Sequence, residues 1–344
     1  ERSMKKRIPE FENILRAFKR EKPDRPTLFE LDMNMPLYEA ANGREYTGSD
    51  MLSLLAFTAE AFAKLGYDYI VAKACAMVFP TRDQTHLSTV SQNDGGLVTD
   101  WSSFESYPWP GPDGYDYSHL KDVVRYLPGN MKLIVVSPGG VIRNVTDIVG
   151  YENLCYMVYD EPELVKALFE RVGQRLLRYY ERALEYDAVG ALCINDDWGF
   201  NTQTLLPPAM MREYVFPWHK RYVDLAHEAG RPMLLHSCGN IKQVMDDVVK
   251  MGYDAKHSYE DSIQPVEEVY EQWHDRLCIV GGMDVDFMCR ESEEAIANRV
   301  RAMLDRTGSR GGYLMGTGNS VPEYMPRNHY LTMVKETIGY NPLL

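Results

Sequence analysis

The sequence predicts an α/β fold, a single (β/α)8 TIM barrel that occupies residues 1–344 as one domain. Short apolar runs that end in glycine or polar residues alternate eight times with amphipathic helical segments, which is the pattern of a closed parallel barrel. The chain has 344 residues and is 45% hydrophobic, enough to bury a large core. No linker, low-complexity tract or second hydrophobic centre divides it.

The predicted elements follow in order along the chain. A helix over 9–20 comes first, and the segments between the strands have helical periodicity, above all 160–186, 241–251 and 292–306. Residues 79–130, after the second strand, are rich in Gly, Pro, Trp and Tyr, and we expect them to form an inserted lid near the mouth. The eight expected strands cover 27–31, 67–72, 132–137, 189–194, 232–236, 254–257, 277–281 and 312–315.

Composition excludes several classes of partner. The chain has 37 basic and 50 acidic residues and a formal charge of −13, which argues against nucleic acid and anionic membranes. No apolar stretch approaches the roughly 18 residues of a transmembrane helix, and the charged start of the chain has no apolar segment behind it. We therefore expect a cytoplasmic protein. Its six cysteines lack disulfide-framework or CxxC spacing, so reduced thiols are expected.

The most informative motif is Leu-His-Ser-Cys-Gly at the end of the fifth strand. His236 and Cys238 are two residues apart, so both side chains lie on the same side of the strand at its C-terminal mouth. A histidine and a cysteine in this place are usually core or loop residues. However, Glu260 follows the next strand, and the three side chains can converge in a barrel mouth. This ligand set predicts a catalytic zinc site with an open position.

The other strand ends supply further candidates. Asp196 and Asp197 are adjacent acids after the fourth strand, and they repel each other unless one is protonated, paired or facing a metal. Alternatively, one caps a helix and the other orients a neighbouring side chain. Asp284, after the seventh strand, has the same two interpretations. Lys73, after the second strand, either anchors a substrate carboxylate or pairs with such an acid.

Three stretches of the chain resemble the uroporphyrinogen decarboxylase superfamily. They are the opening Asn-Ile-Leu-Arg-Ala-Phe-Lys-Arg-Glu-Lys-Pro-Asp-Arg-Pro at 13–26, Val-Gly-Gly-Met-Asp at 280–284, and the glycine-rich end of the last strand. The resemblance implies a (β/α)8 fold and one of two chemistries: metal-free decarboxylation of a tetrapyrrole, or zinc-dependent methyl transfer that involves a corrinoid protein. The related cobalamin-independent methionine synthases bind zinc through His-x-Cys and a downstream Glu.

Two departures separate this chain from the decarboxylases. The decarboxylases carry an Arg-Gln-Ala-Gly-Arg-Tyr motif after the first strand for their polyanionic substrate, whereas this chain reads Leu-Asp-Met-Asn-Met-Pro, with Asp32. They also lack the His-x-Cys pair. The methyltransferase branch fits better, although Asn319 stands where its members usually supply a last thiolate. His257, three residues before Glu260, is an alternative ligand.

The resemblance therefore implies a methyltransferase that moves a methyl group from a small methoxylated or methylated donor to a corrinoid protein, with zinc as Lewis acid. Transfer in the reverse direction belongs to the same branch. The proton for the leaving oxygen would come from Asp196, Asp197 or His257. Asp284 is a further catalytic candidate. The expected substrate-binding residues are Asp32, Asn34, Lys73, Trp198, Tyr259 and Asn319.

Two alternatives stay open. One is a metal-free decarboxylase of another substrate, in which His236 and Asp284 transfer protons. The other is a non-catalytic binder of a corrinoid or tetrapyrrole. The identity of the methyl donor and a homo-oligomeric state are also left open.

Overall fold

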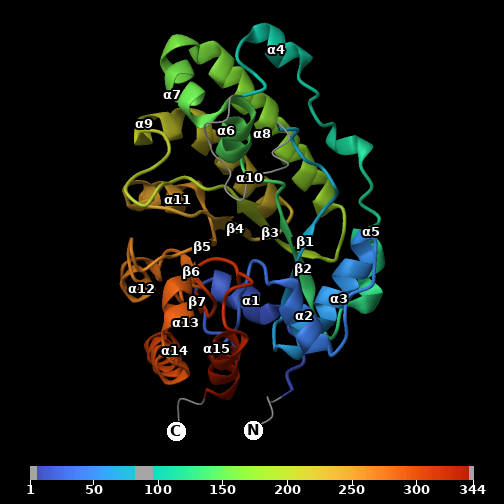
Figure 1. The fold of residues 1–344 in the computed structure, drawn as a ribbon, viewed down its shortest axis with the longest axis vertical. Helices are drawn as coiled ribbons and strands as arrows, with labels where there is room; N and C mark the ends of the chain where they lie inside the picture. Colours follow the sequence, from blue (N-terminus) through green and yellow to red (C-terminus); the bar gives the residue numbers. More distant parts are fainter. Residues whose placement is uncertain (1–5, 82–95, 341–344) are drawn as a thin grey trace.

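The computed structural model describes residues 6–81 and 96–340. These residues form an α/β fold whose parallel strands curl into an incomplete barrel with helices around it (Figure 1). The strands form one seven-stranded sheet in the order of the sequence. They are β1 (Tyr69–Lys73), β2 (Lys132–Val136), β3 (Val189–Asn195), β4 (Met233–His236), β5 (Ala255–His257), β6 (Cys278–Val280) and β7 (Tyr313–Leu314).

Helices surround this sheet, with α6, α7, α8 and α10 on one side of it and α13, α14 and α15 on the other in Figure 1. The α-helices are α1 (Glu12–Phe18), α2 (Met35–Asn42), α3 (Met51–Lys64), α4 (Trp101–Ser106), α5 (His119–Asp122), α6 (Val141–Val149), α7 (Tyr151–Asp160), α8 (Pro162–Leu184), α9 (Pro208–Met210), α10 (Phe216–Glu228), α11 (Met245–Met251), α12 (Val266–Trp273), α13 (Val285–Arg290), α14 (Glu293–Thr307) and α15 (Arg327–Gly339). Shorter helical turns are η1 (Pro112–Gly114), η2 (Val123–Tyr126), η3 (Met211–Val215) and η4 (Lys242–Val244).

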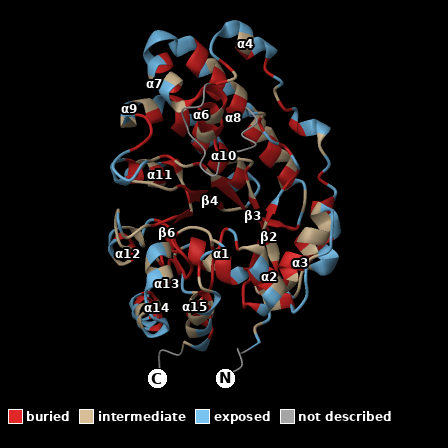
Figure 2. Cartoon of the chain, in the orientation of Figure 1, coloured by how far each residue is buried: buried red, intermediate tan, exposed pale blue. Residues whose placement is uncertain are grey.

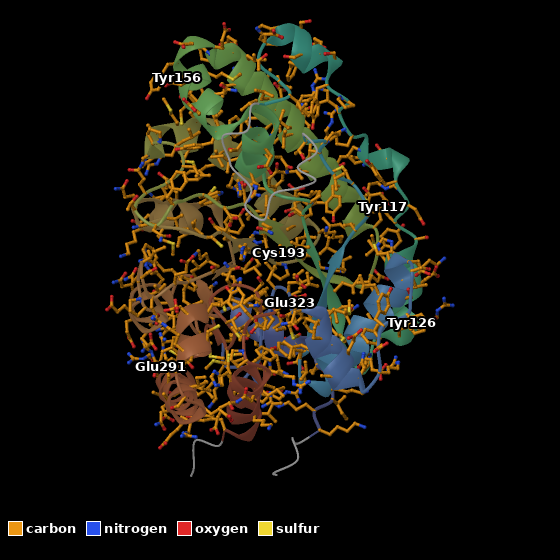
Figure 3. The ribbon with its side chains drawn as sticks, viewed as in Figure 1. Tyr117, Tyr126, Tyr156, Cys193, Glu291 and Glu323 are labelled. Atoms are coloured by element: carbon orange, nitrogen blue, oxygen red, sulfur yellow. The ribbon has the colours of Figure 1, made fainter. Side chains whose placement is uncertain are left out.

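The strands are near-continuous apolar runs because both faces of a parallel sheet are covered. Burial is concentrated along them, and exposed residues lie on the outer helices (Figure 2). Cys193 on β3 is fully buried at the centre of the molecule, whereas Tyr156 on α7 lies at its edge (Figure 3). The register pairs His236 on β4 with Asn195 on one side and with His257 on the other. His236 and His257 are therefore neighbours where these strands end, and their Nδ1 atoms lie 2.8 Å apart.

The expected first strand, 27–31, is not a strand in the structure. It forms a single parallel bridge, from Leu28 to Met315 beyond β7. On the side of β1, the Tyr69 hydroxyl lies 2.6 Å from both the backbone nitrogen and the backbone oxygen of Glu30. A side chain thus takes the backbone groups that a ladder between the first segment and β1 would use. The seven other expected strands form close to their predicted positions.

The described part of the expected lid packs against α8 and, further along the chain, against α3. Arg171 lies over the Phe104 ring at 4.9 Å, and Arg175 lies over the Trp109 ring at 5.2 Å. Asp113 forms an ion pair with Arg178 of the same helix at 2.7 Å. Residues 82–95 of the expected lid lie outside the described residues.

The expected helix 160–186 forms as α8, which begins and ends two residues inside the expected bounds. Residue 160 ends α7, and α8 begins at Pro162, a residue that favours the first turn of a helix. Among the described helices, none is both long and apolar enough to cross a membrane.

Candidate functional site

The end of β4 brings together three groups that can bind a metal. They are Asp197, His236 and Cys238, whose ligand atoms all lie within 4.8 Å of one another. The Cys238 sulfur lies 3.5 Å from Nε2 of His236, and Oδ1 of Asp197 lies 3.9 Å from the same nitrogen. Zinc bonds of about 2.0–2.3 Å would place two ligands of a tetrahedral site roughly 3.3–3.8 Å apart. The spacing and the donor types therefore fit a zinc ion.

The backbone holds this group in place. Asp197 follows β3, and its Oδ1 accepts a hydrogen bond of 2.9 Å from the backbone nitrogen of Cys238. Its second oxygen lies 3.7 Å from a guanidinium nitrogen of Arg143. The Cys238 sulfur also contacts the Ser258 hydroxyl at 3.7 Å. One carboxylate thus links the ends of two neighbouring strands.

Hydrogen bonding determines which ring nitrogen of His236 is free to bind a metal. The Thr317 carbonyl oxygen, 3.2 Å from Nε2 of His257, can only accept, so this nitrogen carries the proton. Burial lowers the pKa of His257 well below its usual range, so the ring is neutral and its Nδ1 is an acceptor. His236 then donates from Nδ1, 2.8 Å away. Its Nε2, which faces Cys238 and Asp197, is left with a free lone pair.

Burial favours the neutral forms of the His236 imidazole and the Cys238 thiol. It lowers the pKa of His236 to about 3, with a smaller effect from Lys256. Burial and the neighbouring Asp197 raise the pKa of Cys238 to about 12. A neutral imidazole is ready to bind a metal, whereas a thiol must first lose its proton.

Asn319 and Glu260 occupy different positions around this group. Nδ2 of Asn319 lies 3.2 Å from the Cys238 sulfur, so the place expected for a further thiolate does adjoin the site. Glu260 is half-buried and is not a member of the group of three. It lines a neighbouring pocket, and burial and Asp284 raise its pKa.

Asp196 has a different environment from Asp197. It is fully buried and accepts hydrogen bonds from the backbone nitrogens of the first turn of α6, including that of Arg143 at 2.9 Å. His219 and the Trp198 indole also contact one of its oxygens, at 2.8 and 3.3 Å. A Cβ at Gly140 would lie 1.9 Å from its Cγ, so glycine makes this approach possible. Asp196 therefore anchors a helix, and Trp198 is part of the core.

Two other expected site residues cap helices. Asp284 begins α13 and accepts from the backbone nitrogens of Phe287 and Asp261, both at 2.9 Å. Asn34 begins α2, where its oxygen accepts from Leu37 at 3.0 Å. Both side chains therefore hydrogen-bond to backbone groups, at the start of their own helix and in a remote segment.

The remaining expected residues surround the strand ends. Asp32 and Lys73 are exposed and form no ion pair within the described part of the chain. The ring of Tyr259 lies under Nζ of Lys256, 4.1 Å from its centroid. Lys256 was missed as a site residue, although a lysine inside a run expected to be a buried strand is an unusual signal.

The chain is similar to known proteins of two different activities. A uroporphyrinogen decarboxylase from Anaeromyxobacter sp. (strain Fw109-5) is 25% identical over 177 residues, which are 52% of this chain and 48% of that protein. A methylated-thiol–coenzyme M methyltransferase from Methanosarcina mazei is 26% identical over 194 residues, which are 55% of this chain and 49% of that protein. The chain thus spans about half the length of the curated relatives that it matches.

A solved structure of a methyltransferase from Methanosarcina mazei shares the fold. It has a TM-score of 0.71 and 14% identity, and the match covers 96% of this chain and 98% of that chain. The family model described as uroporphyrinogen decarboxylase (URO-D) matches residues 97–340, which is most of the chain. The chain therefore belongs to the URO-D family.

Proposed function

We propose that this protein is a methyltransferase that moves a methyl group from a small methoxylated or methylated compound to a corrinoid protein. The observation that carries the proposal is the group of Asp197, His236 and Cys238, in which an imidazole nitrogen with a free lone pair faces a thiol and a carboxylate. The similarity to a methyltransferase of Methanosarcina mazei supports it. Residues 1–344 would act as one domain.

Each residue of the site has a separate role in this reaction. When bound by Asp197, His236 and Cys238, zinc would supply Lewis acidity toward the heteroatom that carries the methyl group. His257 orients the His236 ring, and Asn319 and Ser258 contact the Cys238 sulfur. The group that can supply a proton to the leaving oxygen is Glu260, because Asp197 would bind the metal as a carboxylate, and both oxygens of Asp196 and both ring nitrogens of His257 are already engaged.

Decarboxylation is the second candidate, since uroporphyrinogen decarboxylases are similar to this chain to the same degree as the methyltransferase. The acidic residues of the mouth argue against it. Asp32 stands where a polyanionic substrate needs cations, and the chain has a formal charge of −13. A smaller or less charged substrate would be required for this chemistry.

Metal content is the first test. Protein from zinc-replete medium should hold about one equivalent of zinc per chain, and Cys238→Ala should lose most of it, because affinity rests on the thiolate. Cys155→Ala, a half-buried cysteine on α7, is the matched control and should retain the metal. Wild-type protein without zinc under these conditions would rule out the zinc-dependent reaction.

Turnover is the second test. With a reduced corrinoid protein and a methoxylated aromatic donor, the absorbance change from cob(I)alamin to methylcobalamin should appear, and Cys238→Ala should abolish it. Uroporphyrinogen should give no coproporphyrinogen in a parallel reaction. Enzymatic formation of coproporphyrinogen, with no corrinoid signal for any donor, would support the decarboxylase instead.

A further inference from the structure

A pocket of about 220 Å³ lies beside the candidate metal group, between α11 and α12. It adjoins the group through Gly239, which follows Cys238, and through Ser258, whose hydroxyl contacts the Cys238 sulfur. Clefts that hold drug-sized ligands measure roughly 300–1,000 Å³, so this pocket suits a smaller molecule. Its apolar walls come from Ile241, Met245, Ile263, Val269 and Trp273.

The floor of this pocket carries an unusual cation. Lys256 lies on β5 and is only 2% exposed. Its ammonium group donates to the Ser258 carbonyl and lies over the Tyr259 ring, but it forms no ion pair with any acid of the described chain. An ammonium group has three donors, so hydrogen-bonding capacity remains. Burying a cation without a counter-ion is costly, and a binding function would explain a lysine at this position.

The pocket is locally positive in an acidic protein. Two lysines line it, Lys242 at the rim and Lys256 inside, against a single carboxylate, Glu260. Lys242 is exposed and donates to the Ile263 carbonyl at 2.7 Å, which leaves Lys256 as the cation that faces the interior. The formal charge of the whole chain is −13. The sign of the charge in the pocket is thus opposite to that of the whole chain, which favours binding of an anion there.

We propose that this pocket binds a small monocarboxylate with an apolar body of about the size of one aromatic ring. The carboxylate accepts hydrogen bonds from the Lys256 ammonium, and the ring packs on Trp273 and the aliphatic walls. Lys256 is the lysine inside the pocket, so it matches a single carboxylate. The site goes beyond the proposed function, since binding needs neither a metal nor a corrinoid protein.

Calorimetric titration with benzoate tests the proposal, with benzamide as the neutral isostere and with chelator-treated protein throughout. Wild type should bind benzoate, and benzamide should bind at least about 10-fold more weakly, the size of one hydrogen bond to a charged group. Lys256→Met should weaken benzoate to the level of benzamide. Lys242→Met, at the exposed rim, should change the Kd by no more than about 2-fold.

A second variant separates binding from folding. Lys256→Met should fold, because methionine replaces a buried cation with an apolar chain of similar length. Ile263→Trp fills the pocket from its rim and leaves Lys256 in place, so it should also abolish benzoate binding. Benzoate binding that is unchanged in either variant, or absent from wild type at millimolar concentration, would overturn the proposal. Because the metal has been removed, a failure of methyl transfer would not affect these results.

Discussion

His236 and His257 form the pair on which the candidate metal group depends. Each ring is buried, and each is neutral because burial lowers its pKa. The Thr317 carbonyl fixes the proton of His257, and His257 then fixes the proton of His236. A second residue that holds a metal-binding histidine in one tautomer commonly tunes the affinity of the site.

Replacement of His257 should therefore weaken metal binding without removing a ligand. We expect His257→Phe to lower zinc affinity by about 10–100-fold, the range found for such outer contacts. His257→Gln should recover part of this loss, because its amide oxygen can accept from Nδ1 of His236 and its amide nitrogen can donate to Thr317. Competition with a chromophoric chelator measures both variants.

Nitrogen-15 shifts of the imidazole rings give an independent readout of the same prediction. In metal-free wild type, His236 should carry its proton on Nδ1. In His257→Phe this preference should be lost. Equal zinc affinity in wild type and both variants would show that His257 does not position His236.

A substitution at Asn319 should raise zinc affinity, whereas the substitutions at His257 should lower it. Its amide nitrogen lies 3.2 Å from the Cys238 sulfur, so Asn319→Cys places a second thiol beside the first. Zinc affinity should rise by at least about 10-fold, because a charged soft ligand is added. Asn319→Ala removes the amide without adding a ligand and should not raise the affinity. If the cysteine variant also leaves affinity unchanged, position 319 does not reach the metal.

At the scale of the elements, the end of β3 connects a helix to the candidate site. Asp196 is the cap of the first turn of α6, and Asp197, the next residue, turns toward Cys238. Successive side chains at a strand end point in opposite directions, so two adjacent acids serve two purposes. The helix anchor and the metal group are therefore mechanically linked through one backbone segment.

Loss of the α6 anchor should destabilise the protein. Asp196→Ala leaves the first-turn nitrogens, His219 and Trp198 without their acceptor, and we expect the free energy of unfolding to fall by about 3–5 kcal/mol. Asp147→Ala is the control, because its ion pair with Arg143 lies on the same helix but is half-exposed. It should cost less than about 1 kcal/mol. Denaturation midpoints compare the variants, and similar losses in both would contradict the anchoring role.

At the scale of the whole molecule, Glu30 helps to close the curled sheet. It lies on the first extended segment, is fully buried, and accepts from the backbone nitrogen of Thr317 at 2.9 Å. The Thr317 hydroxyl lies 2.6 Å from Glu30 and 2.9 Å from the Asn319 carbonyl, but it has only one proton to donate. A protonated Glu30 resolves this conflict by donating to the hydroxyl.

The pKa of Glu30 makes stability depend on pH. Burial raises this pKa from 4.5 to about 8, so the folded protein holds a proton that the unfolded chain releases. Stability should therefore fall as pH rises from about 5 to 8, by about 1 kcal/mol per pH unit. Glu30→Gln, which mimics the protonated group, should flatten this part of the profile. Parallel pH profiles of unfolding in both proteins would contradict the assignment.

The repeated alternation of apolar runs and helices was sufficient to locate seven strands, because a parallel strand that is buried on both faces appears in the sequence as a continuous apolar run. It failed at 27–31, where the Tyr69 hydroxyl, distant in sequence, takes the backbone groups of Glu30. That contact is absent from the local pattern.

The sequence by itself determined the family, the parallel sheet and the placement of His236 beside Cys238, since these depend on local periodicity and on two residues of one strand end. Only the tertiary structure decided that Asp197 joins this pair while Asp196 anchors a helix, and that Glu260 faces a separate pocket with Lys256. The physical reason is that side-chain direction at a strand end depends on hydrogen bonds to neighbouring strands and helices, and those partners are remote in the sequence.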